Sequence, residues 1–241
     1  MPKITGANLD EHREKTRDAL FSALSSLMRE YSFDQISIAQ IARRAGIGRT
    51  AFYNHYEDKE SLLVALIFAA TENFTKVLAS ALEEVDDPIQ KIRVYIRAQL
   101  ELKSQYNLGV SLGSAAAHPR SQIRDHAKIV HHIIFRLIET AHQAGKISQP
   151  ATPQTVRLVL SCLSGTELPI DPVKRAATKA STEAFILRAL GAEEADIAYI
   201  DPAIEHLKLR FTKVAPAVRP GPGTTPSRCP ITGAITYRAA S

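Results

Sequence analysis

The chain has 241 residues, of which 45% are hydrophobic and 23% charged, an ordinary composition for a soluble globular protein with a core of its own. Two cysteines are too few for a disulfide framework, and the N-terminus has no hydrophobic segment that would act as a secretory signal. No apolar run approaches the roughly 18 residues that a membrane span needs. The composition therefore favours a cytoplasmic protein without a membrane partner.

The net charge of +5 does not by itself mark a nucleic-acid-binding end of the chain. The first sixty residues are neutral overall, and the basic excess lies mainly in residues 121–180. Residues 35–56 nevertheless contain three arginines and no acid: Arg43, Arg44 and Arg49. Contacts with DNA phosphates depend on such a local patch and not on the total charge.

The first predicted element is a helix over residues 10–30, preceded by a loose arm of residues 1–9. Asp10 is its predicted N-cap, and apolar residues recur at helical spacing from Leu20 to Leu27.

A second, short helix has an unusually well-marked start and end. Ser37 and Gln40 form an S-x-x-Q capping box, and Ile36 and Ile41 can close a hydrophobic staple around it. Gly46 suits the left-handed conformation that ends a helix. A tight turn at this point predicts that another helix follows directly.

Gly48 begins the next short helix, which runs to His55, and Asp58 caps a long one. In the short helix Phe52 and Tyr56 are four residues apart and are expected to pack inward. The outer face is then left to polar residues that can meet DNA: Arg49, Thr50, Tyr53 and Asn54. Arginine and asparagine can bond guanine and adenine edges through two hydrogen bonds, while threonine and tyrosine can reach a methyl group or a phosphate.

Ser37 and Lys59 each open a helix, where backbone N–H groups favour an anion, so both are candidate phosphate clamps. Two short helices with a tight turn and an acid-free polar face predict a helix-turn-helix that offers its second helix to the DNA major groove. The alternative is that any short pair of helices in an all-helical protein shows the same pattern.

The rest of the chain keeps helical periodicity, which predicts an all-α fold. After the long helix, further helices are expected at residues 89–106, 119–145, 153–167, 172–190 and 202–212, with a short helix or a loop at 109–117. Residues 213–241 are rich in proline and glycine and predict a disordered tail, with a small hairpin around Thr232 and Gly233 as the alternative.

Residues 10–63 resemble the N-terminal DNA-binding region of the tetracycline-repressor (TetR) family. The resemblance rests on the IAxxAGI core at residues 41–47, the FYNHY run at 52–56 and the DKExLL start of the long helix at 58–63. The family is all-helical and typically homodimeric. Its C-terminal domain commonly binds a small molecule that changes the spacing of the two DNA-binding domains in the dimer. The resemblance thus implies a ligand-responsive transcriptional regulator, most often a repressor, acting on a pseudo-palindromic double-stranded operator.

The resemblance also implies DNA contacts at matching positions. These are Ser37, Arg49, Thr50, Tyr53, His55 and Lys59, with Arg44 and Asn54 as further candidates. Three residues depart from the family's pattern: Gly48 replaces the usual serine or threonine cap, Tyr56 replaces the common phenylalanine, and Glu57 stands where proline is common. Glu57 places a negative charge near the DNA backbone and is expected to lower affinity.

For the C-terminal part, the resemblance implies an effector-binding and dimerisation domain over residues 58–212, after a DNA-binding domain over 10–57. The candidate pocket residues are Phe68, Phe74, Tyr95, Gln99, Leu102, Tyr106, His126, His131 and Phe135. The candidate dimer residues, on the last two main helices, are Val156, Leu160, Leu163, Ala177, Ala180, Ala184 and Leu187. Each of these residues is also consistent with plain core.

Other functions have weaker support. Several histidines in residues 118–142 suggest a metal sensor, but no HxxxH or CxxC spacing occurs, so neither a metal nor a cofactor is expected. The chain has no phosphate-binding loop, nucleophile elbow or metal-ligand motif, so it is not expected to be an enzyme. A protein-interaction module or an activator of the same fold stays open as the main alternative.

Overall fold

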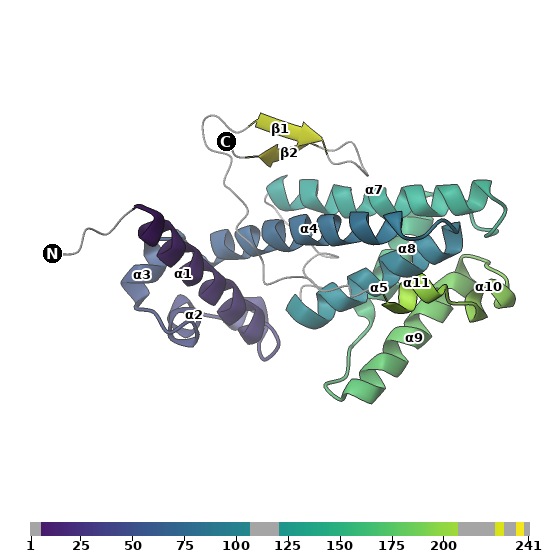
Figure 1. The fold of residues 1–241 in the computed structure, drawn as a ribbon. Helices are drawn as coiled ribbons and strands as arrows, with labels where there is room; N and C mark the ends of the chain where they lie inside the picture. Colours follow the sequence, from purple (N-terminus) through teal and green to yellow (C-terminus); the bar gives the residue numbers. More distant parts are fainter. Residues whose placement is uncertain (1–5, 107–120, 207–224, 229–234, 239–241) are drawn as a thin grey trace. The chain divides into compact units, whose positions relative to one another are not determined.

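The computed structural model describes residues 6–106, 121–206, 225–228 and 235–238 (Figure 1). These residues form helices, apart from one two-stranded hairpin, which confirms the predicted all-α class. One compact unit ends at Asn73 and a second begins at Phe74. The elements are α1 (Gly6–Leu27), a 3₁₀ helix η1 (Phe33–Gln35), α2 (Ile38–Arg44), α3 (Arg49–Tyr53), α4 (Lys59–Glu83), α5 (Pro88–Tyr106), α7 (Ser121–Gln143), α8 (Pro153–Gly165), α9 (Pro172–Ala189), α10 (Glu194–Ala198), α11 (Pro202–His206), β1 (Thr225–Arg228) and β2 (Ile235–Arg238).

The first unit is built from α1, α2, α3 and the first part of α4. The leucines that recur along α1 from Leu20 onwards are buried, and α1 packs on α2, which packs on α3. The predicted N-cap at Asp10 was wrong, because α1 already begins at Gly6. An ion pair of 2.7 Å between Lys15 and Glu11, one turn apart, stabilises the helical conformation in this part of α1.

The second unit is organised around α5, which contacts α7, α8 and α9 (Figure 1). The start of α5 is fixed by Asp87, whose carboxylate accepts hydrogen bonds of 2.9 and 3.0 Å from two backbone amides of the first turn. Each of α8 and α9 begins with a proline after a capping residue, Thr152 and Asp171 respectively. These local signals explain why the sequence predicts the helix starts so closely.

At the end of the second unit, the helices of the structure differ from the predicted ones. The short α10 was missed, and α11 is described only as far as His206, so the rest of the predicted helix over 202–212 lies outside the described residues. The predicted helix or loop at 109–117 also lies outside them.

In the C-terminal stretch, β1 pairs antiparallel with β2, with Thr225 opposite Arg238. The hairpin alternative is therefore correct for these residues. The first strand, β1, lies earlier in the sequence than a tight hairpin around Thr232 and Gly233 would place it.

By length and composition alone, the helix α4 is long and apolar enough to cross a membrane. More than half of its most apolar stretch, 56%, is buried inside the protein. Leu66 and Phe74 of this helix have no exposed surface. Burial of this kind is what a core helix of a soluble protein shows, so α4 is weak evidence for a membrane.

Candidate nucleic-acid interface

The start of α2 is fixed by the two side chains of the predicted capping box. The Ser37 Oγ accepts a hydrogen bond from the Gln40 amide at 3.3 Å, and the Gln40 Oε1 accepts one from the Ser37 amide at 2.8 Å. Ile36 and Ile41, the two residues of the staple, are buried. Gly46 follows the helix with a φ of +71°, a left-handed conformation that glycine adopts at little cost. Local sequence therefore determines how α2 leads into α3.

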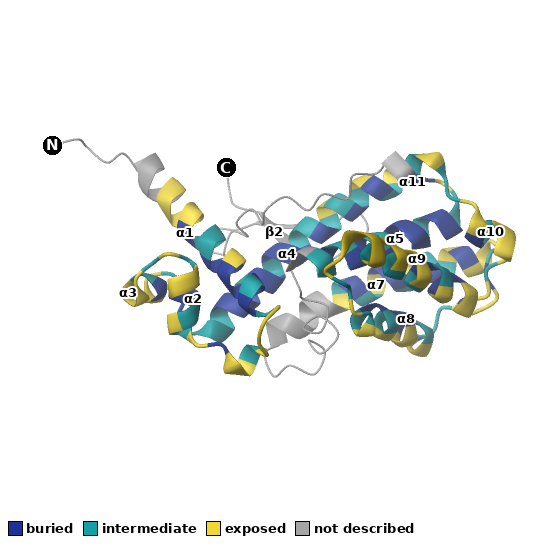
Figure 2. Ribbon diagram, turned by 90° about the horizontal axis from the view of Figure 1, so that it is seen from below, coloured by how far each residue is buried: buried dark blue, intermediate teal, exposed yellow. Residues whose placement is uncertain are grey.

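The next helix, α3, turns its polar residues outward because aromatic rings hold its other side. Phe52 has no exposed surface, Tyr56 has 6%, and their ring centroids lie 6.2 Å apart. The Phe52 ring also meets the Tyr53 ring edge-on at 5.6 Å. The residues of this segment that were predicted to face DNA are exposed: Arg49, Thr50, Tyr53 and Asn54 (Figure 2). A short helix therefore offers several hydrogen-bonding groups on one side.

Lys59, a predicted phosphate clamp, directs its ammonium group toward the protein's own backbone. Its Nζ donates hydrogen bonds to the carbonyl oxygens of Phe33 at 3.0 Å, Asp34 at 3.1 Å and Ile36 at 3.0 Å. These carbonyls belong to η1 and the residue that follows it, directly before Ser37. Lys59 thus ties the start of α4 to the segment that leads into α2.

Arg44, a further candidate for DNA contact, is engaged in a pair between α2 and the end of α1. Its guanidinium donates to both carboxylate oxygens of Glu30, at 2.8 and 3.1 Å, and to the Ser26 hydroxyl at 2.8 Å. The pair lowers the pKa of Glu30, chiefly through the hydrogen bond from Arg44. Glu30 therefore brings a carboxylate next to the basic patch, which the sequence alone did not indicate.

His55 directly follows the C-cap of α3 and is half-buried. Burial lowers the pKa of its imidazole, and the positive charges of Arg13, Arg17 and His12 lower it further. Of the predicted contact residues, His55 is thus the one whose charge depends on its surroundings near neutral pH.

Comparison with known proteins places this geometry in a family. Residues 20–66, which hold α2, α3 and the turns around them, match the model described as "Bacterial regulatory proteins, tetR family". Residues 20–66 therefore form a DNA-binding region of the TetR family. A helix-turn-helix-type transcriptional regulator of Haemophilus influenzae is 35% identical over 75 residues, which are 31% of this chain and 37% of that protein. The match to this curated relative therefore covers only a little over a third of its length.

Solved structures resemble the chain over a longer range. The structure of a putative TetR-family transcriptional regulator from Rhodococcus sp. has a TM-score of 0.57 at 16% identity and covers 76% of this chain and 99% of its own. A TetR transcription regulator from Haloarcula marismortui has a TM-score of 0.55 at 16% identity, covering 75% and 97%. The fatty acid degradation regulator FadR from Bacillus halodurans has a TM-score of 0.55 at 15% identity, covering 74% and 97%. At such identities these likenesses show the fold.

Some of the effector-pocket residues that the resemblance implied are buried in the core, and others are half-buried. Phe74 and Tyr95 have no exposed surface and meet edge-on at 5.9 Å. The Tyr95 hydroxyl accepts a hydrogen bond from Gln99 at 3.0 Å and donates one to the Val130 carbonyl at 3.4 Å, and burial raises its pKa. Leu102 is also buried, while Phe68, His131 and Phe135 are half-buried. The side chains of Tyr106 and His126 lie outside the described residues.

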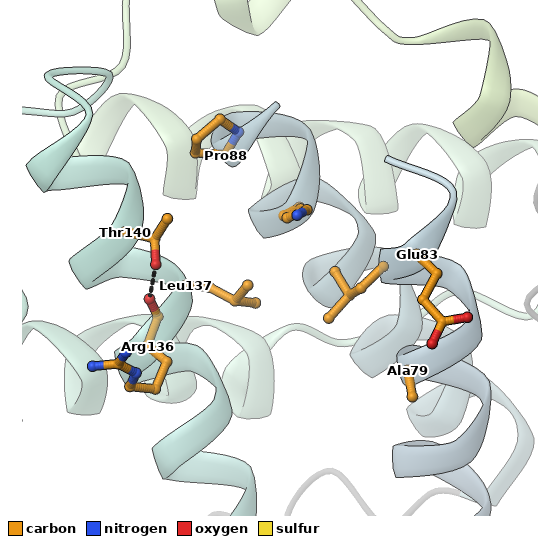
Figure 3. Close-up of a pocket in the computed structure, with 8 residues that line it drawn as sticks. Ala79, Glu83, Pro88, Arg136, Leu137 and Thr140 are labelled. Atoms are coloured by element: carbon orange, nitrogen blue, oxygen red, sulfur yellow. Dashed lines mark hydrogen bonds between the residues drawn. The ribbon is translucent and has the colours of Figure 1, made fainter. Parts of the chain in front are cut away.

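A hollow of about 300 Å³ lies instead between α4, α5 and α7 (Figure 3). Its lining residues are Ala79, Leu82, Glu83, Pro88, Lys91, Arg136, Leu137 and Thr140. None of them was predicted as a pocket residue, because a space between three helices depends on how the helices pack against one another. Arg136 forms an ion pair with Glu139, one turn along α7.

The candidate dimer residues divide between core and surface. Val156, Leu163 and Leu187 are buried within the protomer, whereas Ala177 and Ala180 are exposed and Leu160 and Ala184 are half-buried. The sequence missed the large apolar side chains that α8, α9 and the turn between them expose: Leu158, Ile170, Val173 and Phe185. Helical periodicity predicted apolar faces on both helices, but it could not tell the inner face from the outer one.

A buried charge network was also missed. Arg93 on α5, only 2% exposed, forms an ion pair with Glu183 on α9, and Arg97 donates to the same carboxylate at 2.6 Å. Arg93 also donates to the carbonyls of Ile197 at 2.8 Å and Tyr199 at 3.2 Å. A glutamate among apolar helix residues was the available signal, but its partners are distant in sequence.

Among the residues that the structure describes, no group of three or more histidine, cysteine, aspartate or glutamate side chains could hold a metal ion. Cys162 is a free, half-buried cysteine, and Cys229 lies outside the described residues.

Proposed function

We propose that the chain is a sequence-specific, DNA-binding transcriptional regulator, acting in the cytoplasm as a homodimeric repressor that a small molecule releases from a pseudo-palindromic operator. Residues 10–57 form its DNA-binding domain, residues 58–212 bind the effector and the partner subunit, and residues 213–241 are a tail. The match of residues 20–66 to a family of bacterial regulatory proteins supports the further expectation that the chain is not an enzyme.

The observation that carries the proposal is the outer face of α3. Four adjacent or nearly adjacent polar side chains are exposed there, on a helix whose other side is held by the buried Phe52 and Tyr56. Arg49 and Asn54 can read base edges, while Thr50 and Tyr53 can reach a thymine methyl or a phosphate. A helix fixed in this way enters the major groove without ordering itself first, which favours binding.

Exposed apolar residues support the homodimer. On α9, Val173, Ala177 and Ala180 recur at intervals of three or four residues and are all exposed. Phe185, five residues after Ala180, is 61% exposed. Small side chains allow close approach of a second pair of helices, and two symmetric subunits suit two half-sites.

For the effector, the hollow between α4, α5 and α7 is the part of the second unit that supports a binding site. Its volume of about 300 Å³ is at the lower end for small-molecule sites. The pocket residues predicted from the sequence are a second candidate effector site. Because Phe74 and Tyr95 are buried there, a ligand would have to displace core side chains to bind.

Fluorescence anisotropy tests the function. The duplex is the DNA upstream of this protein's own gene, and a scrambled duplex of equal length is the control. The wild-type protein should prefer the upstream duplex at about 0.1 M salt and lose affinity steeply as salt rises. Arg49→Ala should weaken binding, whereas Lys76→Ala, which removes an exposed charge from the second unit, should not.

Equal affinity for both duplexes would overturn the proposal and favour a protein-interaction module. If DNA binds, a transcription reporter separates repressor from activator, and a screen of metabolites for release of the duplex tests the effector.

A further inference from the structure

The hollow between α4, α5 and α7 contains a cation that the described part of the chain leaves without a partner. Lys91, near the start of α5, lines the hollow and is half-buried, and its ammonium group forms no ion pair with any described residue. The other described cations of α5 are all engaged: Arg93 and Arg97 with Glu183, and Lys103 with backbone carbonyls at the end of α8. Of the four, Lys91 is therefore the one whose charge is available to a ligand.

The walls of the hollow around this charge are mainly apolar. Ala79 and Leu82 come from α4, Pro88 from the start of α5 and Leu137 from α7. Figure 3 shows the Leu137 side chain pointing from α7 toward α4. At about 300 Å³ the space lies at the lower end for small-molecule sites, so it suits a compact apolar body better than a long chain.

The hollow also has a second cation and one acid. Arg136 of α7 is paired with Glu139, which offsets part of its charge. Glu83, at the end of α4, is exposed and, like Lys91, forms no ion pair within the part of the chain that the structure describes. One unpaired ammonium and one unpaired carboxylate in the same hollow favour a ligand with a single negative charge, because a second one would face Glu83 without a cation of its own.

We propose that the hollow binds a small molecule with one carboxylate group and a compact apolar body. The Lys91 ammonium binds the carboxylate, with Arg136 as a second donor, and the body packs on Leu82 and Leu137. Glu83 repels ligands with a further negative charge and so narrows the class to monocarboxylates. This inference rests on the proposed function, to which it adds the chemical class of the effector and the residue that selects it.

Calorimetric titration of the whole chain without DNA tests the ligand class. The probes are cyclohexanecarboxylate and cyclohexanecarboxamide, which share one apolar body and differ in charge. The wild-type protein should bind the carboxylate with a Kd of about 1 mM, as expected for a ligand of this size, and the carboxamide about tenfold more weakly. Only the affinity for the carboxylate should fall as salt rises, because salt screens the contact between charges.

Two charge variants test the roles of the individual residues. Lys91→Gln should lower the affinity for the carboxylate about tenfold and leave that for the carboxamide unchanged. Glu83→Gln should act in the opposite direction and raise the affinity for the carboxylate about two- to fivefold, because it removes a repulsive charge. Lys174→Gln, which changes an exposed lysine of α9 outside the hollow, is the control and should bind both probes like the wild type.

A third variant tests the location of the site. Ala79→Leu adds bulk inside the hollow, so it should weaken binding of both probes. Ser80→Leu is the matched control, because Ser80 is the adjacent, exposed residue of α4 and does not line the hollow. Loss of binding in Ser80→Leu as well as in Ala79→Leu would place the site elsewhere.

Equal wild-type affinity for the two probes, or binding of neither up to about 10 mM, would overturn the inference. A Lys91→Gln variant that keeps the wild-type preference for the carboxylate would overturn it too, with Glu83→Gln and Ala79→Leu deciding if Lys91→Gln fails to fold. The titrations contain no DNA, so absence of operator preference in the anisotropy experiment would instead reject the proposed function. Binding of the carboxylate without release of an operator duplex would reject the effector role in that function and not the ligand class.

Discussion

Lys59, the first residue of α4, places its ammonium nitrogen 3.0 Å from the Phe33 carbonyl oxygen and 4.8 Å from the centroid of the Phe33 ring. One charged group therefore joins two segments that are 26 residues apart. Hydrogen bonds from a charged donor are stronger than those between neutral groups, and the ring adds a cation–π contact. The link holds the segment before Ser37 and so sets where α2 begins.

Lys59→Ala should consequently lower the free energy of unfolding by about 1–3 kcal/mol, since it leaves backbone carbonyls without their donor. Urea unfolding measures this loss. A lysine that served only as a phosphate clamp would give the opposite pattern, with unchanged stability and a smaller salt slope of DNA binding. Ser37→Ala offers a comparison, because it removes a cap of the same segment and should cost about 1 kcal/mol.

The buried network between α5 and α9 leads to a second prediction. Glu183→Gln removes the charge that compensates the buried Arg93, so it should destabilise the protein by about 3 kcal/mol in urea unfolding. The double variant Arg93→Met with Glu183→Met should recover most of this loss, because it removes the buried charge, and Arg97, which also loses Glu183, is 28% exposed to water. A double variant that is less stable than Glu183→Gln alone would show that the hydrogen bonds of Arg93 to α10 and the residue after it matter more than its charge.

Glu30 is expected to weaken DNA binding through its pair with Arg44. Glu30→Gln removes a carboxylate beside the basic patch and frees Arg44, so affinity for DNA should rise and the salt slope should steepen. The thermal midpoint should change little, because both side chains are exposed. Anisotropy and thermal unfolding on the same samples check both parts, and unchanged affinity would mean that Arg44 lies beyond the reach of DNA.

The helix-turn-helix could be predicted in detail because its signals are local. The capping box of Ser37 and Gln40 spans three residues, and Gly46 needs only its own φ to end the helix. The partners of Lys59 and Arg44 could not be predicted, because they lie 14 to 26 residues away and depend on how the helices pack. These contacts change the interpretation of two predicted DNA-contacting residues without changing the fold.

In the second unit the sequence predicted the helices but not their faces. Val156 and Leu158 are both apolar residues of α8, yet one is 3% exposed and the other 58%. Glu183 pairs with a residue 90 positions away, and no pattern in the sequence connects them. Packing between distant helices also creates the hollow, so its lining could not be predicted from periodicity.

Ala180→Arg tests the dimer. The side chain is exposed on α9, so the protomer should fold normally, but a bulky charge on this face should block the approach of a second subunit. Light scattering should show a monomer, and affinity for the two-half-site operator should fall at least about tenfold, as expected when two linked binding events become one. Ala189→Arg is the control, because Ala189 is exposed at the end of α9 on the side opposite to Ala180.

The stability of the folded protein should decrease as the pH falls, because of His131. Burial, followed by the charge of Arg157, lowers the pKa of His131 in the folded protein. Below the ordinary pKa of about 6.5 the unfolded chain therefore binds a proton that the folded protein does not, and stability must fall as pH falls from there to the lowered value. The thermal midpoint of the wild type should decrease from about pH 7 to about pH 5, and His131→Gln should reduce the decrease.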